Sequence, residues 1–563
     1  MSDLRLGPLL RFVDETSATV WVETERAARV TVRAGAATGE TRTFAVHEHH
    51  YALVEVDGLR PGTRTPYVVE LDGAQVWPPA NSPYPAPVIG TLEAGRPLRM
   101  LFGSCRVSVS HDAAGNAQHG VDALRSYALH LAGDTSSGVA DDEWPDLVLF
   151  LGDQVYADDT SEEMKAFIEQ RRDPDQAPWH ELKDYEEYSH LYRLAWGEAA
   201  NRWLLSTLPS AMIFDDHDIR DDWNTSADWR AQMEATDWWH DRVVGGLGSY
   251  WVYQHLGNLG PADRDADPLW RRIRDHDGDD ELDDELDVTA DVDALADRAD
   301  QQPDSYRWSF SRDFDTQARL VVVDSRAARV LTPDRRCMLD DAEMEWLDQR
   351  MTGDVDHLVV GTSLPFLLAP ALHHAEAFGE ALAQGRLGRI FKPFGEWARQ
   401  AADLEHWAAF QDGFQRVGRM VVEVAAGERG RAPRTVTFLS GDVHHSYVAL
   451  AEPDPAGGRT AQSVIVQAVC SPIRNPLPRF MQAATALAAY GRARPTGRLL
   501  GGRVPRSPLR WRLPRGPWYD NNLAVLELRE RELHLAWSRG VDRGEAERPV
   551  LEQVAAVDVP FRD

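Results

Sequence analysis

The chain has 563 residues and a mass of 63.1 kDa, which is enough for more than one folding unit and a large apolar core. Its net charge of −30 and pI near 5.0 exclude general binding to nucleic acid or anionic membranes. Three cysteines cannot form a disulfide framework, so a reducing compartment is expected. The start MSDLRLGPLL lacks the features of a secretory signal, and no run approaches 18 uncharged apolar residues. We therefore expect a cytoplasmic protein without a membrane span.

Residues 1–93 are expected to form a small β-sandwich. Turn residues such as Asp57-Gly58 separate short apolar-alternating runs, which lie at 18–22, 30–32, 52–56 and 67–71. The stretch VEVDGLRPGTRTPYVVELDG resembles a fibronectin-type-III repeat, in which a Leu-x-Pro-Gly corner precedes a strand that carries a Tyr. The proline-rich segment WPPANSPYPAPVIG then predicts a stiff linker.

Residues 97–540 show a different rhythm, in which buried strands alternate with longer helical stretches. Near-continuous apolar runs separated by helices predict an α/β fold whose sheet is covered on both faces. Polar clusters such as GSCR, GDQVYADD, DDHD and SGDVHHS follow these runs directly, so we expect them to converge at the carboxyl ends of the strands. The predicted strands lie at 99–102, 146–151, 211–214, 320–323, 357–360, 436–439 and 464–469, and NLAVLELRERELHLAW predicts a terminal β-hairpin.

Two segments interrupt this pattern. Residues 261–303 contain 16 acidic and 5 basic side chains and are expected to be a solvated, partly disordered insertion. A calcium loop starting at Asp275 would need Gly at its sixth position and Glu at its twelfth, but the sequence has Asp280 and Leu286 there. Residues 473–519 contain ten Arg and no acidic residue. They are either a solvated surface or the border of a cleft for phosphate-bearing substrates.

A group of acidic residues and one histidine follow apolar strands directly. Carboxylates at close quarters repel one another unless protons or a cation intervene, so a pair of metal ions is the simplest explanation. Mixed carboxylate and histidine ligands favour transition metals, and calcium is able to share such a site. Each motif taken alone also has an ordinary structural interpretation as a turn or a helix cap. The residues are Asp153, Asp215, Asp216, Asp218, Asp442 and His444.

Four motifs in series resemble the PhoD-like alkaline phosphatases, which belong to the calcineurin-like metallophosphoesterases. They are FGSCR at 102–106, GDQVY at 152–156, DDHD at 215–218 and SGDVHHS at 440–446. The resemblance covers roughly residues 6–540, apart from the acidic insertion. It implies a two-sheet α/β core behind a β-sandwich, and hydrolysis of phosphate mono- or diesters by in-line attack of a metal-activated hydroxide.

The resemblance also implies roles for individual residues. Cys105 as thiolate, Tyr156 as phenolate and His444 would bind Fe³⁺, Asp153 would bridge two metals, and Asp216 and Asp442 would lie around Ca²⁺. Thiolate and phenolate donors suit a trivalent cation, which lowers their pKa, and Mn²⁺ or Zn²⁺ are alternatives. His217 would donate a proton to the departing alkoxide, and Arg106 would bind a phosphate oxygen through its planar guanidinium.

This chain departs from the family pattern at two places. After DDHD the family commonly has an Asn pair, whereas this chain has Asp221-Asp222-Trp223. Where many metallophosphoesterases supply a histidine from the next strand, VVGTSLP offers Thr362 and Ser363. One ligand is then expected to be water or to come from a loop.

Several residues capable of chemistry have simpler interpretations. Cys337 and Cys470 are expected to be small buried hydrophobes, and the Asp324-Ser325-Arg326 segment is expected to be a structural turn. We leave five histidines out of the metal site, although His445 is close enough to support a ligand: His111, His119, His373, His374 and His445.

These features together predict a metal-dependent phosphoesterase that acts on a small-molecule phosphate ester. The alternative is a metal-binding or partner-binding module on the same fold that no longer catalyses the reaction. The complete set of candidate ligands favours the enzyme, and the altered Asp221-Asp222 segment favours the alternative.

Overall fold

The computed structural model describes residues 4–134, 144–276, 285–332, 335–383, 405–478, 481–482, 505–546 and 548–562. The N-terminal part is all β, as predicted, and forms two sheets with the orders β1-β2-β6-β5 and β4-β3-β7-β8, with β9 beside β7. Its strands are β1 (Leu4–Val13), β2 (Ser17–Thr24), β3 (Arg29–Ala34), β4 (Ala37–Arg42), β5 (Phe44–Val46), β6 (His49–Asp57), β7 (Arg64–Leu71), β8 (Ala74–Trp77) and β9 (Val88–Gly90).

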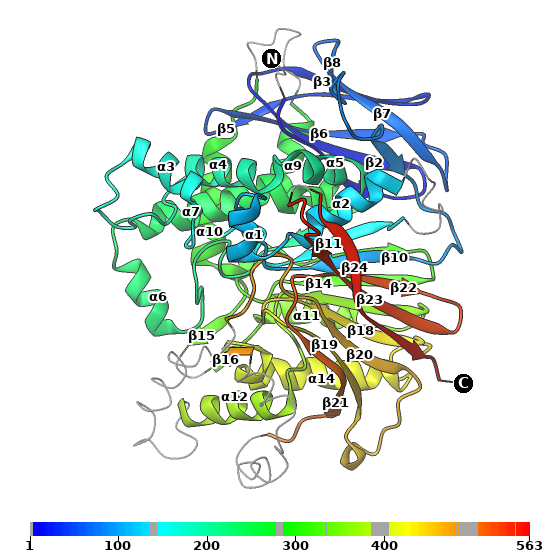
Figure 1. The fold of residues 1–563 in the computed structure, drawn as a ribbon. Coiled ribbons are helices and arrows are strands. Elements are labelled where there is room, and N and C mark those ends of the chain that lie inside the picture. The colour runs from blue at the N-terminus through cyan, green and yellow to red at the C-terminus, as the bar shows by residue number, and fades with distance from the viewer. Residues whose placement is uncertain are drawn as a thin grey trace.

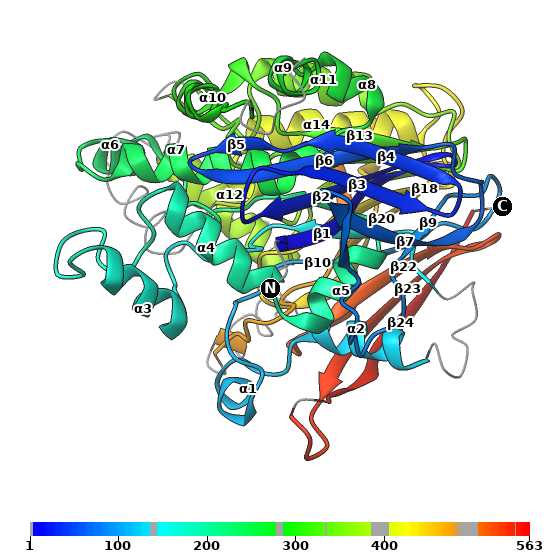
Figure 2. The ribbon, with the colours of Figure 1, turned by 90° about the horizontal axis from the view of Figure 1, so that it is seen from above.

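The N-terminal sheets lie directly on the α/β core (Figures 1 and 2). One apolar cluster contains residues of both parts, among them Trp21 and Trp203. Tyr67, the Tyr of the predicted corner motif, donates its hydroxyl hydrogen bond to the Ser206 carbonyl at 2.6 Å. The side chain of Arg11 is fully buried and reaches the Gln254 carbonyl at 2.5 Å. The two parts therefore share a continuous interior.

The core contains two large sheets. In the first, with the order β12-β11-β10-β22-β23-β24, the three strands nearest the β12 edge are parallel. The predicted hairpin is confirmed as β22 and β23, and β24 extends the sheet beyond residue 540. These strands are β10 (Arg99–Gly103), β11 (Leu147–Leu151), β12 (Ser210–Ile213), β22 (Leu523–Leu528), β23 (Glu532–Val541) and β24 (Val550–Pro560).

The second sheet has the order β13-β14-β17-β18-β20-β19-β21, and β14, β17, β18 and β20 are parallel. All seven strands predicted in the core are confirmed. The strands are β13 (Phe310–Phe314), β14 (Ala318–Val323), β17 (His357–Thr362), β18 (Thr435–Ser440), β19 (Ser446–Pro453), β20 (Val464–Val469) and β21 (Leu509–Trp518), and a separate hairpin is formed by β15 (Val330–Thr332) and β16 (Arg335–Cys337).

The two sheets pack face to face. Trp537 of the first sheet donates its indole N–H to the Val469 carbonyl of the second at 3.1 Å. Gly361 in β17 faces the side chains of Leu149 and Leu151 in β11. Helix α2 covers the outer face of the first sheet, and α11 and α14 cover the second. Apolar residues on both faces of the parallel strands suit this burial, so the predicted α/β sandwich behind a β-domain is confirmed.

The helices in chain order are α1 (Ala113–His119), α2 (Ala123–Asp134), α3 (Glu162–Arg171), α4 (Tyr185–Trp196), α5 (Ala199–Thr207), α6 (Ala227–Glu234), α7 (Trp239–Tyr250), α8 (Pro261–Ala266), α9 (Pro268–Arg274), α10 (Thr289–Gln301), α11 (Asp341–Arg350), α12 (Pro370–Ala383) and α14 (Gln411–Ala425). Several begin at an acidic or hydroxyl cap, as where Asp184 accepts from the Glu187 N–H and Asp340 from the Glu343 N–H. Among the described residues, no helix is long and apolar enough to cross a membrane.

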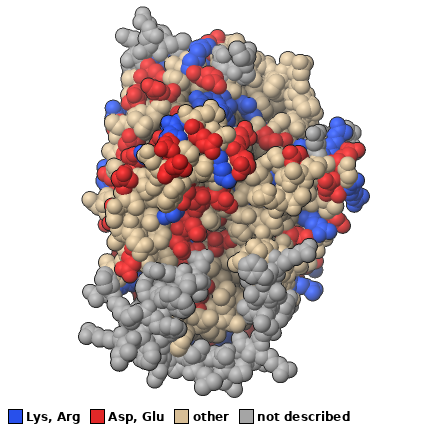
Figure 3. Space-filling view, turned by 60° about the vertical axis from the view of Figure 1, so that its left-hand side comes forward, with Lys and Arg blue, Asp and Glu red and all other residues tan. Residues whose placement is uncertain are grey.

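The expectation of a solvated, partly disordered acidic insertion is wrong for the described residues of 261–303. They form α8, α9 and α10, and α10 buries Val292, Leu295, Ala296 and Ala299 against its neighbours. These positions recur at helical spacing, so one face is apolar despite the acidic composition. The stretch from Asp275 that lacks the calcium-loop pattern lies mostly outside the described residues. Acidic side chains gather across the middle of one face of the molecule (Figure 3).

The Arg-rich stretch is described only in part. Arg474 is fully buried and binds the carbonyl groups of Val109, Ser110 and Gly120. Arg506 and Arg510 pair with Asp454. These three arginines thus support the fold, whereas Arg479, Arg492, Arg494, Arg498 and Arg503 lie outside the described residues.

Candidate metal centre

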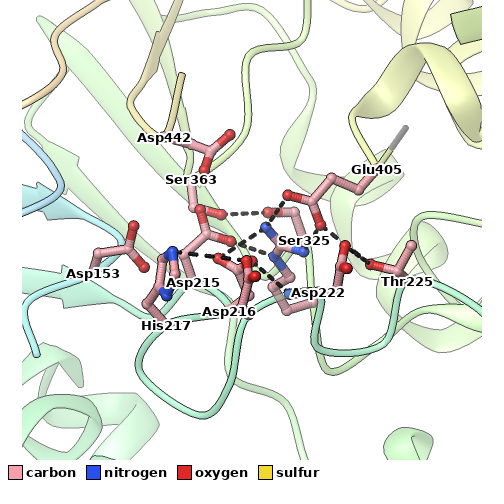
Figure 4. A network of polar contacts seen from close by, with 12 residues as sticks. Asp153, Asp215, Asp216, His217, Asp222, Thr225, Ser325, Ser363, Glu405 and Asp442 are labelled. Atoms are coloured by element: carbon pink, nitrogen blue, oxygen red, sulfur yellow. Dashed lines mark hydrogen bonds and ion pairs between the residues drawn. The ribbon is translucent and has the colours of Figure 1, made fainter. Parts of the chain in front are cut away.

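Four carboxylates meet at the carboxyl ends of three parallel strands. Asp153 follows β11, Asp215 and Asp216 follow β12, and Asp442 follows β18. One oxygen from each lies within 4.8 Å of one from every other, and Figure 4 shows how these side chains lie. Residues far apart in the sequence therefore converge at one edge of the core, as the strand-end pattern predicted.

The backbone at these strand ends is strained. The residues Cys105, Asp153, Asp442 and His444 have φ values of 59°, 50°, 64° and 50°, in the left-handed region. This region is uncommon for residues other than glycine, and such strain collects at functional sites. Four of the six predicted metal ligands therefore adopt a costly conformation that turns the chain sharply after a strand.

Two glycines allow the strand ends to approach one another. A Cβ at Gly152 would lie 2.7 Å from the Asp215 Cβ, and Gly152 has a φ of 100°. A Cβ at Gly441 would lie 1.9 Å from the Ser104 Oγ. The close packing around the acidic cluster thus depends on the absence of a side chain at Gly152 and Gly441, which precede Asp153 and Asp442.

Asp218, the last residue of DDHD, holds two of these strand ends together. Its Oδ2 accepts hydrogen bonds from the backbone N–H groups of Asp153 and Asp215, both at 2.9 Å. Its Oδ1 accepts from Gln254 at 3.2 Å. Asp218 is therefore bound to the scaffold of the site, and it is absent from the group of four carboxylates.

The charges of the cluster require compensation. Burial and the nearby charges of Cys105 and Asp215 raise the pKa of Asp153 well above its usual range. Burial also raises the pKa of Asp215 to about 6, although Arg326 opposes the shift. Asp153 Oδ1 and Asp215 Oδ2 are buried and accept no hydrogen bond from the described residues. Since a cation stabilises ionised carboxylates in such surroundings, the oxygen donors fit a metal centre.

Cys105 and Tyr156 lie beside these carboxylates. Cys105 Sγ is 3.3 Å from Asp153 Oδ2, and it accepts a hydrogen bond from Ser471 Oγ at 3.3 Å. Cys105 and Tyr156 belong to one small buried cluster, and the Tyr156 hydroxyl is buried without a well-formed hydrogen bond to any described residue. Burial and the Asp442 charge raise the pKa of the Cys105 thiol to about 12. A bound cation would favour the thiolate instead.

His444 lies on the turn after β18 and is linked to Cys105 through the Ser471 hydroxyl. Its backbone N–H donates to Ser471 Oγ at 3.1 Å. Burial lowers the pKa of the ring to about 4, so it is neutral at physiological pH, as a metal ligand must be. Although Cys105 Sγ is close to Asp153, neither Cys105 nor His444 joins a group of three or more ligand atoms that all lie within 4.8 Å of one another among the described residues.

His217 lies at the border of the cluster with a defined orientation. Its Nδ1 contacts both oxygens of Asp158, at 2.9 and 3.0 Å, and its ring packs against that of Tyr156 with centroids 4.7 Å apart. It also groups with Asp216 and Asp221 within 4.8 Å. Burial opposes a charge on this ring, but Asp158 and Asp216 outweigh it and raise the pKa of His217 well above its usual value.

Arg106 is engaged away from the carboxylates. Its Nε and Nη2 donate to Asp122 Oδ2 at 2.9 and 2.7 Å, and its Nη1 donates to the Ala195 carbonyl at 2.7 Å. The guanidinium is buried, and these contacts explain its position. They give Arg106 a structural role and lend no support to the predicted phosphate contact.

Sequence reasoning missed three charged residues of this site. The Asp324-Ser325-Arg326 segment does form the expected turn, since Asp324 accepts from the backbone N–H of Arg326 at 2.7 Å. The Arg326 side chain, however, pairs with Asp215, Asp216 and Glu405. His406 Nε2 lies 3.2 Å from Asp442 Oδ2. Neither Glu405 nor His406 follows an apolar strand, so the strand-end signal did not indicate them.

The two departures from the family motifs have clear positions. The backbone N–H of Asp222 donates to Asp216 Oδ2 at 3.0 Å, so the Asp221-Asp222 segment touches the cluster. Ser363 Oγ is 2.8 Å from Ser325 Oγ, and Thr362 Oγ1 accepts from the Trp407 indole at 3.4 Å. Thus the hydroxyls at the end of β17 bind protein groups.

The remaining cysteines and histidines agree with their simpler interpretations. Cys337 and Cys470 are buried, unpaired and part of apolar clusters. His445 Nδ1 contacts the Val443 carbonyl at 2.6 Å. Among the described residues, none of the five histidines left out of the metal site takes part in a group of ligand atoms: His111, His119, His373, His374 and His445.

Two facing sheets with buried carboxylates at their strand ends define an α/β protein with an acidic centre capable of holding metal ions. A family model described as PhoD-like phosphatase matches residues 135–494, and a domain of unknown function (DUF7800) matches residues 1–89. The chain therefore belongs to the PhoD-like phosphatase family, as its motif series indicated.

Solved structures support the fold. A chain described as "Structure of PhoD" aligns with a TM-score of 0.59 and 13% identity, covering 100% of this chain and 91% of its own. Two other solved structures align with TM-scores too low to indicate a shared fold. The type III pullulan hydrolase from Thermococcus kodakarensis has a TM-score of 0.13 and 10% identity, covering 99% of this chain and 97% of its own. A maltogenic amylase from S. marinus has a TM-score of 0.16 and 8% identity, covering 99% of this chain and 82% of its own. No curated protein matches the sequence significantly.

Proposed function

We propose that this chain is a metal-dependent phosphoesterase that hydrolyses small phosphate mono- or diesters. The observation that carries the proposal is the group of four buried carboxylates in a member of the PhoD-like phosphatase family. Three of the four, Asp153, Asp215 and Asp216, present a buried oxygen without a hydrogen-bond partner among the described residues. A buried cluster of this kind is costly in a protein that does not bind a cation.

The proposed ligands are those implied by the family motifs, with Asp215 beside them. Asp153, Asp216 and Asp442 would supply carboxylate oxygens. Cys105, Tyr156 and His444 would supply a thiolate, a phenolate and an imidazole from the same region. This donor set suits Fe³⁺ with Ca²⁺, and Mn²⁺ or Zn²⁺ are the alternatives. When bound, the metals would supply the positive charge that activates water and neutralises the phosphoryl group.

His217 is the proposed proton donor to the leaving alkoxide. Because its Nδ1 faces Asp158, the proton to be transferred is carried on Nε2. Asp158 thereby fixes the orientation of the ring, and its charge helps to hold the proton on the imidazole. The ring is partly exposed, with a side-chain accessibility of 25%, so a substrate oxygen is able to approach it.

Metal analysis combined with assays on aryl phosphate monoesters and diesters tests the proposal. We expect bound transition metal, hydrolysis that a chelator abolishes, and recovery when metal is returned. If iron is the metal, a tyrosinate absorption band should disappear in Tyr156→Phe. Protein that binds none of Fe, Ca²⁺, Mn²⁺ and Zn²⁺ and hydrolyses neither substrate would favour the non-catalytic binding module.

A further inference from the structure

Glu405 and His406 are adjacent residues that reach two different parts of the acidic cluster. His406 lies between two carboxylates: its Nδ1 is 3.0 Å from Glu376 Oε1, and its Nε2 is 3.2 Å from Asp442 Oδ2. Both are ion-pair contacts, since neither ring nitrogen makes a well-aligned hydrogen bond to a described residue. Glu376 belongs to α12 and Asp442 follows β18. His406 thus connects a helix outside the sheet to a proposed metal ligand at the end of a strand.

Glu405 reaches the other two carboxylates, Asp215 and Asp216, through Arg326. Arg326 Nη2 donates to Glu405 Oε1 at 2.8 Å, and a second contact joins Nη1 to Oε2. The same guanidinium pairs with Asp215 and Asp216 after β12. Figure 4 shows Glu405 linked to these carboxylates by this network. The carboxylates of two separate strands are therefore held from a single dipeptide.

All members of this network are buried. Glu376, Glu405, Arg326 and His406 have relative exposures of 1%, 2%, 0% and 8%. Buried charges persist in proteins when they are paired, and removal of one partner leaves the other without compensation. The orientation of the site carboxylates therefore depends on these contacts, because little water is present to replace them.

We propose that the Glu405-His406 dipeptide positions the metal-binding carboxylates, His406 by holding Asp442 and Glu405 by holding Arg326 against Asp215 and Asp216. His406 is in turn oriented by Glu376. The inference rests on the metal centre of the proposed function. Groups behind a metal ligand that fix its direction commonly affect metal affinity by about 10–100-fold.

The direction in which metal affinity changes when His406 is removed distinguishes a positioning role from a purely electrostatic one. A cationic ring beside Asp442 would repel a metal ion, so on charge alone the loss of His406 should tighten metal binding. If His406 positions Asp442, its loss should weaken binding, because the carboxylate becomes free to rotate away. Charge alone and positioning thus predict opposite changes for His406→Ala.

Titration of the metal-free full-length protein with Mn²⁺, Ca²⁺ and Zn²⁺ tests the inference without an activity assay. Relative to wild type, His406→Ala and Glu376→Gln should raise the Mn²⁺ dissociation constant by about 10–100-fold. His406→Gln should recover part of the affinity, because the amide keeps an N–H donor at this position. His374→Asn is the matched control, because it removes an exposed histidine from α12, the helix that carries Glu376. It should bind Mn²⁺ as wild type does.

Glu405→Gln should also weaken Mn²⁺ binding. His406→Gln keeps the test open if His406→Ala does not fold, because charge alone predicts tighter Mn²⁺ binding than in wild type and positioning predicts weaker binding. The positioning role is overturned if the wild-type protein binds Mn²⁺ and His406→Ala and Glu376→Gln bind it as tightly as wild type does, or more tightly. That result would leave the proposed function intact. A wild-type protein that binds none of the three metals, nor iron, overturns the proposed function and this inference with it.

Discussion

Arg326 Nη2 lies 3.2 Å from Asp216 Oδ1 in the interior of the protein. Since Arg326 follows β14 and Asp216 follows β12, this ion pair connects the two sheets at the edge where the carboxylates meet. The arginine also pairs with Asp215 and Glu405. One fully buried cation thus balances part of the negative charge of the site before any metal is considered.

Replacement of Arg326 by Met should therefore destabilise the metal-free protein by about 3–5 kcal/mol, because three buried carboxylates lose their partner. Urea unfolding in the presence of a chelator measures the effect. Arg335→Met is the matched control, since Arg335 pairs with Asp341 where the side chains are 37% and 71% exposed. That change should cost less than about 1 kcal/mol. Equal losses in the two variants would contradict the role of Arg326.

His217→Gln should lower kcat by an amount that depends on the leaving group. A general acid contributes about 10²–10⁴-fold where the leaving group is basic. The loss should thus approach this range for alkyl phosphates and be much smaller for 4-nitrophenyl phosphate, whose leaving group needs little protonation. Rates for a series of esters of increasing leaving-group pKa provide the measurement. A uniform loss across the series would show that His217 has another role.

The sequence predicted the framework of the site well because the relevant signals are local. Each predicted core strand is a run of apolar residues, and the polar motif after it marks where the strand ends. Since parallel strands end at one edge of a sheet, Asp153, Asp216 and Asp442 were expected to converge, and they do. The family motifs then related this edge to phosphate chemistry.

The contacts between side chains were not predictable in the same way, because they depend on long-range packing. Arg106 follows a strand and adjoins Cys105, yet its guanidinium is held by Asp122. His406 has no strand before it, and α12 and β18 must both be placed before its two carboxylate partners are known. The acidic insertion is different, because the helical spacing of Val292 and its apolar neighbours was present in the sequence and was outweighed by composition.

Gly441→Ala should disturb the site through Ser104. The added Cβ would lie 1.9 Å from Ser104 Oγ, which accepts the backbone N–H of Asp442 at 3.0 Å. Such overpacking commonly costs about 1–3 kcal/mol, and the displaced hydroxyl would also release Asp442. We therefore expect reduced stability on thermal or urea unfolding and weaker metal binding. Gly457→Ala, which meets no atom within 4 Å, should remain within about 0.5 kcal/mol of wild type. A Gly441→Ala protein with wild-type stability would show that Ser104 shifts freely.

His49 should make the stability of the protein depend on pH. Its Nδ1 is 3.0 Å from Glu23 Oε1 in β2, and its Nε2 is 2.6 Å from Glu186 Oε2 in α4, so it joins the N-terminal domain to the core. Burial opposes the charged ring, but the contacts with Glu186 and Glu23 outweigh it and raise the pKa of His49 above its usual 6.5.

The native state therefore holds the His49 proton at a higher pH than the unfolded chain does. The stabilisation is complete below pH 6.5 and is lost as the pH rises through the native pKa, with a slope of at most about 1.4 kcal/mol per pH unit. Urea unfolding from pH 5.5 upward should show wild-type stability falling relative to His49→Gln, and parallel curves for the two proteins would exclude His49 as the cause.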